Sequence, residues 1–183
     1  FSDTLNKQIA RSAFNKGKNV WVRNIYRSRD IEGSSSVTGF TDKAYGIAFG
    51  GETDIDESVK VGFAGASIDS SINVSNNQGG SNGSSYFASA YTNYKTNDNL
   101  FASLALTLGY HDGKNTRLVN NSGVQSYAKS ETGNRDIGLN LQVGKKYSVK
   151  EVWNVMPKVS LSYIKTMAGE IRESGAGNSQ ISV

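Results

Sequence analysis

Apolar residues recur at every second position over several long stretches of this 183-residue chain. A period of two places successive side chains on opposite faces of a β-strand, whereas a helix repeats its apolar residues every three or four positions. One face of the segment 100–110 carries Leu100, Ala102, Leu104, Leu106, Leu108 and Tyr110. The sequence therefore predicts an all-β fold, and glycine and serine are frequent between the apolar stretches.

Seven strands are predicted from this pattern, with weaker alternation in the first and the fourth. Their approximate ranges are 20–30, 39–51, 58–70, 84–95, 99–112, 125–147 and 152–166. Long polar connections, at 31–38, 71–83 and 113–124, alternate with short turns. In an antiparallel meander this places long loops at one end and tight turns at the other, as in outer-membrane barrels.

The two faces of the predicted strands differ in a way that favours a membrane barrel. Gly46, Ala48, Gly62 and Ala64 are too small and too apolar for a surface in water, and they suit a lumen that something bulky occupies. Strands of ten or more residues match the ~9 to 11 residues that cross a bilayer at a tilt. We therefore expect a transmembrane, antiparallel, up-and-down β-barrel.

The apolar face of such a barrel contacts lipid. The residues expected to face lipid are Tyr45, Ile47, Phe49, Val61, Phe63, Leu104, Leu106, Leu108, Leu139, Leu141, Leu161 and Tyr163. A soluble barrel shows the same period with its apolar face turned inward, so a soluble all-β adhesin or ligand carrier stays an alternative.

The first eighteen residues follow a different rule. Leu5, Ile9 and Ala13 recur at a spacing of four, which predicts a short helix over 5–16. This segment carries a net charge of +3 out of +4 for the whole chain. The excess of positive charge therefore belongs to one helix, and no basic and aromatic stripe for nucleic acid is expected on the strands.

No motif in the sequence predicts an enzyme, a cofactor site or a metal site. The chain has no cysteine, which excludes thiolate chemistry and disulfides, and its single histidine, His111, excludes a multi-histidine metal cluster. His111 followed by Asp112 is better interpreted as a surface histidine at a strand end than as part of a catalytic triad. No stretch approaches the ~18 apolar residues of a membrane-spanning helix.

Several segments in order resemble one known family. Leu-Asn-Lys-Gln at 5–8 followed by Val-Trp-Val-Arg at 20–23 is similar to the junction between pore helix and first strand in autotransporter (type V secretion) translocator barrels. The glycine-punctuated run 39–51 resembles the second strand of that family, 157–163 its seventh, and 173–177 the loop before its eighth. No single motif is diagnostic, but the ordered set is fairly specific.

The resemblance implies a twelve-stranded outer-membrane barrel of Gram-negative bacteria, with a helix in its lumen, that helps to export its own N-terminal passenger. Residues 1–18 would be the pore-spanning linker helix, and residues 19–183 the N-terminal part of the barrel, about seven strands. The implied partners are outer-membrane lipid and lipopolysaccharide, the barrel-assembly machinery and the passenger. Some relatives cut themselves at an Asn-Asn pair that is Asp3-Thr4 here, so no catalytic residue is expected.

A barrel with a helix in its lumen also predicts which residues surround the helix. The expected contacts between lumen and helix are Lys7, Arg11, Arg23, Asp42, Gly46, Ala48, Lys60, Gly62, Ala64, Asp136 and Asn140. Because desolvated charges need partners, Lys7 or Arg11 is expected to reach Asp42 or Asp136. A small eight-stranded barrel of the OmpA type fits the length without further strands and remains a second alternative.

Overall fold

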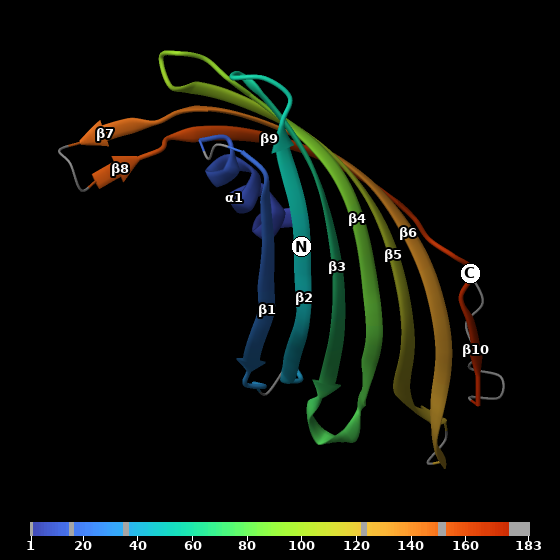
Figure 1. The fold of residues 1–183 in the computed structure, drawn as a ribbon. Coiled ribbons are helices and arrows are strands. Elements are labelled where there is room, and N and C mark those ends of the chain that lie inside the picture. Colours follow the sequence, from blue (N-terminus) through green and yellow to red (C-terminus); the bar gives the residue numbers. More distant parts are fainter. Residues whose placement is uncertain (1, 15–16, 35–36, 122–123, 150–152, 176–183) are drawn as a thin grey trace.

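A strongly curved antiparallel sheet with one helix in its hollow forms the molecule (Figure 1). The computed structural model describes residues 2–14, 17–34, 37–121, 124–149 and 153–175. The helix is α1 (Ser2–Ser12), and the long strands are β1 (Asn19–Ile31), β2 (Phe40–Asp54), β3 (Val59–Val74), β4 (Gly79–Lys95), β5 (Leu100–Asn121), β6 (Val124–Lys145) and β9 (Lys158–Met167). None of the helices among these residues is long and apolar enough to cross a membrane.

The strands follow one another in the sheet in the order of the sequence. β1 to β6 are neighbours in chain order, every pair is antiparallel, and β9 pairs with β6. This confirms the predicted up-and-down meander. Within the described residues the sheet does not close, because β1 and β9 lie at its two edges.

The last strand of the sheet is interrupted by a bulge. Met167 of β9 lies opposite Arg135, and Arg172 of the short strand β10 (Arg172–Ser174) lies opposite Glu131. Four residues therefore separate the paired positions on the β9 side but only three on β6, which is the geometry of a β-bulge. β10 thus continues the ladder of β9 along β6.

Two segments that were expected to be loops are strands instead. β3 and β4 run through most of 71–83, leaving only the 3-10 turn η1 (Ser75–Asn77) and Gln78 between them. β5 and β6 have 22 residues each, and residues 113–121 of the expected loop pair with 124–132 of β6, with Val119 and Ala128 buried together. The long loops were wrongly predicted because these segments lack apolar alternation and form strands through pairing with their neighbours.

The lengths of β5 and β6 exceed what a bilayer requires. A strand of 22 residues is about 73 Å long, and even at a 45° tilt it spans more than the ~30 Å hydrocarbon core. The hairpin of β5 and β6 therefore extends beyond the membrane. It does so at the end of the sheet where β1 ends and β2 begins (Figure 1).

The segment before β9 also differs from the prediction. The expected strand 152–166 is divided into β8 (Trp153–Val155), which pairs with β7 (Tyr147–Val149), and β9, with Pro157 at the break. Proline has no N–H for a central ladder, so the strand cannot continue through it. The tip of this hairpin lies outside the described residues.

The helix begins and ends earlier than predicted. α1 covers Ser2–Ser12 instead of 5–16, and the Ser12 hydroxyl donates to the Ile9 carbonyl at 2.9 Å. Such a bond competes with continuation of the helix. Lys16, within the expected range, and the expected loop and strand over 176–183 lie outside the described residues.

Candidate functional site

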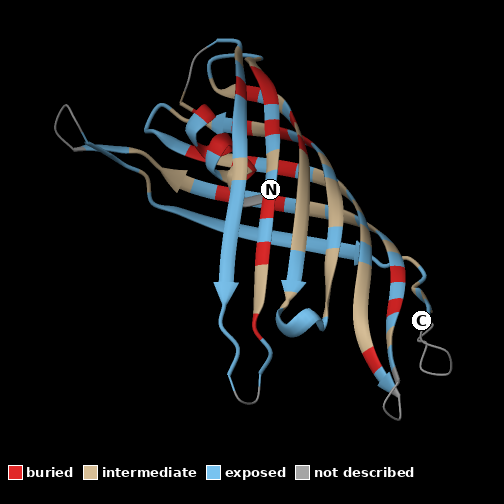
Figure 2. Ribbon diagram, turned by 90° about the horizontal axis from the view of Figure 1, so that it is seen from below, coloured by how far each residue is buried: buried red, intermediate tan, exposed pale blue. Residues whose placement is uncertain are grey.

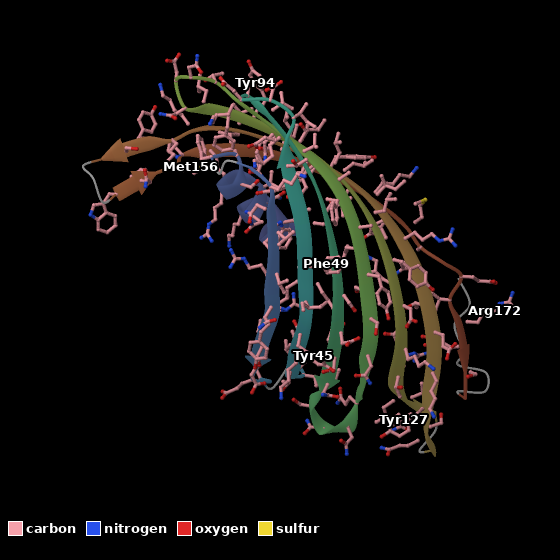
Figure 3. The ribbon with its side chains drawn as sticks, in the orientation of Figure 1. Tyr45, Phe49, Tyr94, Tyr127, Met156 and Arg172 are labelled. Carbon is pink, nitrogen blue, oxygen red and sulfur yellow. The ribbon has the colours of Figure 1, made fainter. Side chains whose placement is uncertain are left out.

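The convex face of the sheet carries an exposed apolar belt. All twelve residues expected to face lipid lie on it, from Val61 at 36% exposure to Leu161 at 71%. Aromatic residues bound the belt at one end at Tyr26, Tyr45, Tyr86 and Tyr110, and at the other end at Tyr94, Tyr147 and Trp153. Figure 3 shows Tyr45 and Tyr94 towards opposite ends of the strands. Such girdles are typical of transmembrane barrels.

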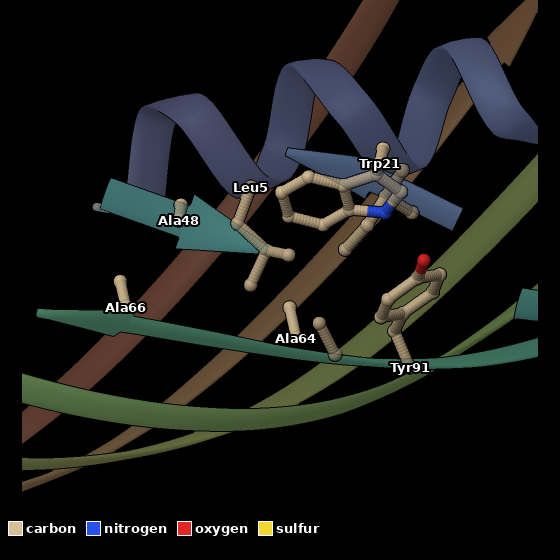
Figure 4. Close-up of a cluster of buried hydrophobic side chains, with 8 residues drawn as sticks. Leu5, Trp21, Ala48, Ala64, Ala66 and Tyr91 are labelled. Carbon is tan, nitrogen blue, oxygen red and sulfur yellow. The ribbon is translucent and has the colours of Figure 1, made fainter. Parts of the chain in front are cut away.

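The concave face is buried where α1 lies on it (Figure 2). Leu5 and Ile9 are 1% and 0% exposed. They pack in one cluster with Trp21, Ala48, Ala64, Ala66, Tyr91 and Ala105 (Figure 4). The apolar side of the helix is therefore enclosed by residues from five strands, most of them alanine.

Two glycines make room for the aromatic rings of this cluster. A Cβ on Gly62 would lie 2.3 Å from the Tyr91 ring, and one on Gly50 would lie 2.5 Å from the Trp21 ring. Each ring occupies the space that a side chain would fill on the neighbouring strand. The small residues of the wall thus admit both the helix and the rings that pack against it.

Hydrogen bonds to uncharged groups of the helix hold it to the wall. The Asn93 amide donates to the Ile9 carbonyl at 3.3 Å and to the Ser12 hydroxyl at 3.0 Å. The Gln142 amide donates to the Asn6 carbonyl at 3.4 Å, and Arg23 donates to the Gln8 side chain at 3.2 Å. These bonds fix the helix in position along the lumen.

A charged cluster at the end of the lumen holds the segment that leaves the helix. The Gly17 N–H donates to the Asp54 carboxylate, and Lys60 pairs with Asp54 at 2.8 Å and donates to the Gly17 carbonyl at 3.1 Å. Gly17 has a φ of +81°, which favours glycine. Asp54 ends β2 beside a turn and outside the apolar belt, and the hydrogen bond from Lys60, followed by that from Gly17, lowers the pKa of its carboxyl.

Beyond the helix the lumenal carboxylates pair with residues of the wall. Asp42 pairs with Arg27 at 3.0 Å, and Asp136 lies 2.7 Å from His111. Lys7 and Arg11 are exposed. Both carboxylates therefore have partners on neighbouring strands, and the expectation that Lys7 or Arg11 reaches Asp42 or Asp136 stays a prediction.

His111 lies in a hydrogen-bonded chain on the lumenal face, and its interpretation as a surface residue was wrong. Its Nδ1 is 2.9 Å from the Ser85 hydroxyl, its Nε2 contacts Asp136, and Phe87 packs edge-on against the ring. β4 is paired on both sides through Ser85, so the backbone N–H groups there are already bonded. Acyl transfer needs free backbone N–H groups to stabilise an oxyanion, and the pairing of β4 on both sides leaves none at Ser85.

The remaining residues expected at the lumen lie on the concave face. Gly46, Ala48, Gly62, Ala64, Lys60 and Asn140 alternate with residues of the exposed apolar belt on the same strands. Asn140 donates to the Ser162 hydroxyl at 2.6 Å. No group of three or more His, Asp or Glu side chains that could hold a metal ion occurs in the described part of the chain.

The sequence prediction did not single out Asn93, Gln142, Trp21 and Tyr91, which contact or surround the helix. Gln142 alternates with apolar residues in 137–143, so its position on the polar face was available as a signal. Asn93 was not accessible in the same way, because aromatic residues on both faces of β4 obscure the phase of that strand.

Comparison with known proteins gives a family match over nearly the whole chain. A family model described as "Autotransporter beta-domain" matches residues 20–183. The fold is similar to that of the translocator domain of the autotransporter NalP from Neisseria meningitidis, with a TM-score of 0.78 and 12% identity over 99% of this chain and 63% of that one. The chain thus spans less than two thirds of that domain.

A second similar structure is the beta domain of the Bordetella autotransporter BrkA. Its TM-score is 0.39, with 10% identity over 86% of this chain and 83% of that one. No curated protein sequence matches this chain.

Proposed function

The chain belongs to the autotransporter β-domain family, an integral translocator barrel of the outer membrane, and we propose that it helps to carry its own N-terminal passenger to the cell surface. The observation that supports this role is the position of α1, whose Leu5 and Ile9 are fully enclosed by the concave wall. The two alternatives, an eight-stranded OmpA-type barrel and a soluble adhesin or carrier, do not explain a family match over residues 20–183.

The proposal divides the chain into two parts. Residues 1–18 are a linker helix that lies in the pore after the passenger has passed, and residues 19–183 are the N-terminal part, about seven strands, of a twelve-stranded barrel. Further strands close the gap between β1 and β9, because hydrocarbon offers no hydrogen-bond partner to an open edge. The barrel-assembly machinery supplies those partners during insertion.

The roles of the wall residues follow from the two faces. The exposed belt contacts acyl chains, and the concave face contacts the helix. The chain acts as a transport domain with no catalytic residue and no cofactor.

A disulfide trap tests whether the helix lies in the pore. In the full-length protein in cells, the pair Ser12→Cys and Asn93→Cys should form a disulfide after mild oxidation, because the two native side chains lie 3.0 Å apart. Ser12→Cys with Thr92→Cys is the matched control, since adjacent residues of a strand point to opposite faces. Equal cross-linking of both pairs, or none of the first, would place the helix outside the lumen.

Cysteine labelling tests the orientation. We propose that the end with η1 is extracellular and that the end with the turn 96–99 is periplasmic, because β1 would rise from the periplasmic side. Asn77→Cys should react with an impermeant maleimide on intact cells, and Asn97→Cys should react only after lysis. The reverse pattern would invert the topology.

A further inference from the structure

Above its aromatic girdle, the convex face of the sheet is hollowed and polar. A cavity of about 870 Å³ lies over the ends of β3 to β6 and β10. The outward-facing side chains that line it include Asn82, Lys114, Thr116, Lys129, Glu131 and Arg172. A smaller cavity of about 340 Å³ adjoins it and shares Asn82 and Lys114. A volume of this order is typical of sites for small ligands.

The register shows that this groove lies outside the lumen. Lys114 pairs with Glu131, and Glu131 with Arg172, so all three share the face of Leu108 and Leu139 rather than that of His111. Figure 3 shows Arg172 on the outer side of β6. A molecule in the groove would therefore approach from the membrane or from the space directly above it.

Two further cations lie on the groove side of the apolar belt, Arg135 at the level of the girdle and Lys165 one outward position further into the belt. Arg135 is opposite Tyr110 of the girdle and Met167, and Lys165 is opposite Ile137 on the same outward face. The two are diagonal neighbours across β6 and β9, which places their Cβ atoms about 7 Å apart. Both are exposed. They lie at the level where lipid phosphate groups meet the apolar belt.

The charge of this surface favours an anionic ligand. Five cations, at Lys114, Lys129, Arg135, Lys165 and Arg172, accompany four carboxylates, at Asp69, Asp112, Glu131 and Glu170, which leaves an excess of one positive charge. Lys114 pairs with Glu131 at 3.0 Å and Arg172 with Glu170 at 2.7 Å, so these four hold a mixed array of donors and acceptors in the groove. The amides, hydroxyls and charged groups of the groove can form hydrogen bonds with sugar hydroxyls and with acidic substituents of sugars.

The distance between the pair Arg135 and Lys165, the lower level, and Lys129 in the groove, the upper level, distinguishes between lipids. Arg135 lies six positions along β6 from Lys129, which is about 20 Å along the strand or about 14 Å along the membrane normal at a 45° tilt. The phosphate of a phospholipid reaches only the lower level. A lipid that carries phosphate at the membrane surface and acidic sugars above it reaches both, and this is the chemistry of lipopolysaccharide.

We propose that the outward face of β4, β5, β6 and β9–β10 binds one lipopolysaccharide molecule, with its lipid phosphates on Arg135 and Lys165 and its first sugars in the groove at Lys129. This inference rests on the proposed function, since it requires this end of the barrel to be extracellular. It adds a specific lipid site to a surface that would otherwise contact lipid only through its apolar belt.

Binding of purified lipopolysaccharide to the full-length protein in detergent tests the proposal. Because a cation near a charged lipid surface contributes roughly a fivefold change in affinity, Arg135→Gln with Lys165→Gln should weaken binding about 25-fold. Lys129→Gln should weaken binding about fivefold, but only for lipid that carries its core sugars. Removing the lipid phosphates should abolish the effect of the double variant.

Lys43→Gln is the matched control, because Lys43 is an exposed outward cation beside Tyr45 of the same girdle and outside the groove. It should change affinity by less than twofold. An equal loss in the control, or equally tight binding to phosphatidylglycerol vesicles, would overturn the proposal, since any anionic surface would then suffice. Each variant is first checked for folding by its mobility shift on heating.

The outcome separates this inference from the proposed function. If Asn77→Cys is labelled on cells and the passenger reaches the surface, but lipopolysaccharide binding is unaffected by these substitutions, only the lipid site is wrong. If Asn77→Cys is protected on intact cells, the orientation is wrong and the site fails with it.

Discussion

The lumenal wall has two regions that differ in how they handle polar groups. Where α1 lies, the wall carries Ala48, Ala64, Ala66 and Ala105, and polar wall residues donate hydrogen bonds to uncharged groups of the helix. Beyond the helix, the same face of the same strands carries Arg27 with Asp42, His111 with Asp136, and Arg117 with Glu173.

This difference follows the position of the helix. Water is excluded beneath α1, where an unpaired charge would be costly, and the wall there is small enough for the helix to approach. Further along, Arg27 and Arg117 keep 64% and 41% of their side chains exposed, while their partners Asp42 and Glu173 are largely buried. Water screens an ion pair with one exposed member, so such pairs contribute little. The small residues of the wall therefore indicate where the helix lies, and its ion pairs indicate where the pore is open.

The largest effect is expected at the helix side of the contact. Leu5→Ala or Ile9→Ala should each destabilise the seated helix by about 2 to 5 kcal/mol, because both side chains are fully buried. Hydrogen exchange of the helix amides in the folded barrel measures this. Arg11→Ala on the exposed side of the same helix should stay within about 0.5 kcal/mol. Similar losses at all three positions would remove the distinction between the two sides of α1.

A smaller effect is expected from enlarging the wall. Ala64→Leu should cost about 1 to 3 kcal/mol, since the residue is 4% exposed under the helix. Ser81→Leu, on the lumenal face beyond the helix, should cost less than about 0.5 kcal/mol. Thermal unfolding of the two variants in detergent makes the comparison. Equal costs would mean that the two regions are packed alike.

The wall ion pairs should contribute little. A double-mutant cycle with Arg27→Gln and Asp42→Asn should give a coupling of about 0.2 to 1 kcal/mol, because the Arg27 side chain is 64% exposed. The helix should stay seated in Asp42→Asn, with unchanged ion conductance through the pore. A rise in conductance would restore the hypothesis that helix cations depend on this carboxylate.

The smallest effect is expected from the bonds of Asp54, and it should appear only at acidic pH. Because the pKa of Asp54 is lowered in the folded state, its bonds to Lys60 and Gly17 stabilise that state fully above pH 3.8, the ordinary pKa of the carboxyl. This contribution is lost as the pH falls through the lower pKa of the folded state. Proteolysis near Gly17 should therefore increase below pH 3.8 in the native protein. In Asp54→Asn it should show no such step, and a step retained in that variant would assign the change to another group.

The strands and their faces were accessible from the sequence because alternation is a local property. Leu104, Leu106 and Leu108 are separated by small residues, and this pattern alone predicts an exposed and a covered face. Strand ends were less accessible. The segment 113–121 has no apolar alternation, and it forms a strand because its partner 124–132 is present beside it.

The candidate site was predicted only in part, for a similar reason. Gly46, Ala48, Gly62 and Ala64 were visible as a run of small residues on alternate positions. Asn93 and Gln142 contact the helix from β4 and β6, and nothing local to either segment indicates a partner more than 80 residues away.

The sequence by itself determined the two-residue period of the apolar positions, the number of long strands and the family of this protein. Each was visible in short stretches of the sequence, taken in their order. Only the tertiary structure decided which charges meet. Asp42 and Asp136 were equally available to helix cations in the sequence, and the register of the sheet places Arg27 and His111 closer. Ion pairs form between the nearest suitable groups, and distance in a sheet is set by register and not by position along the chain.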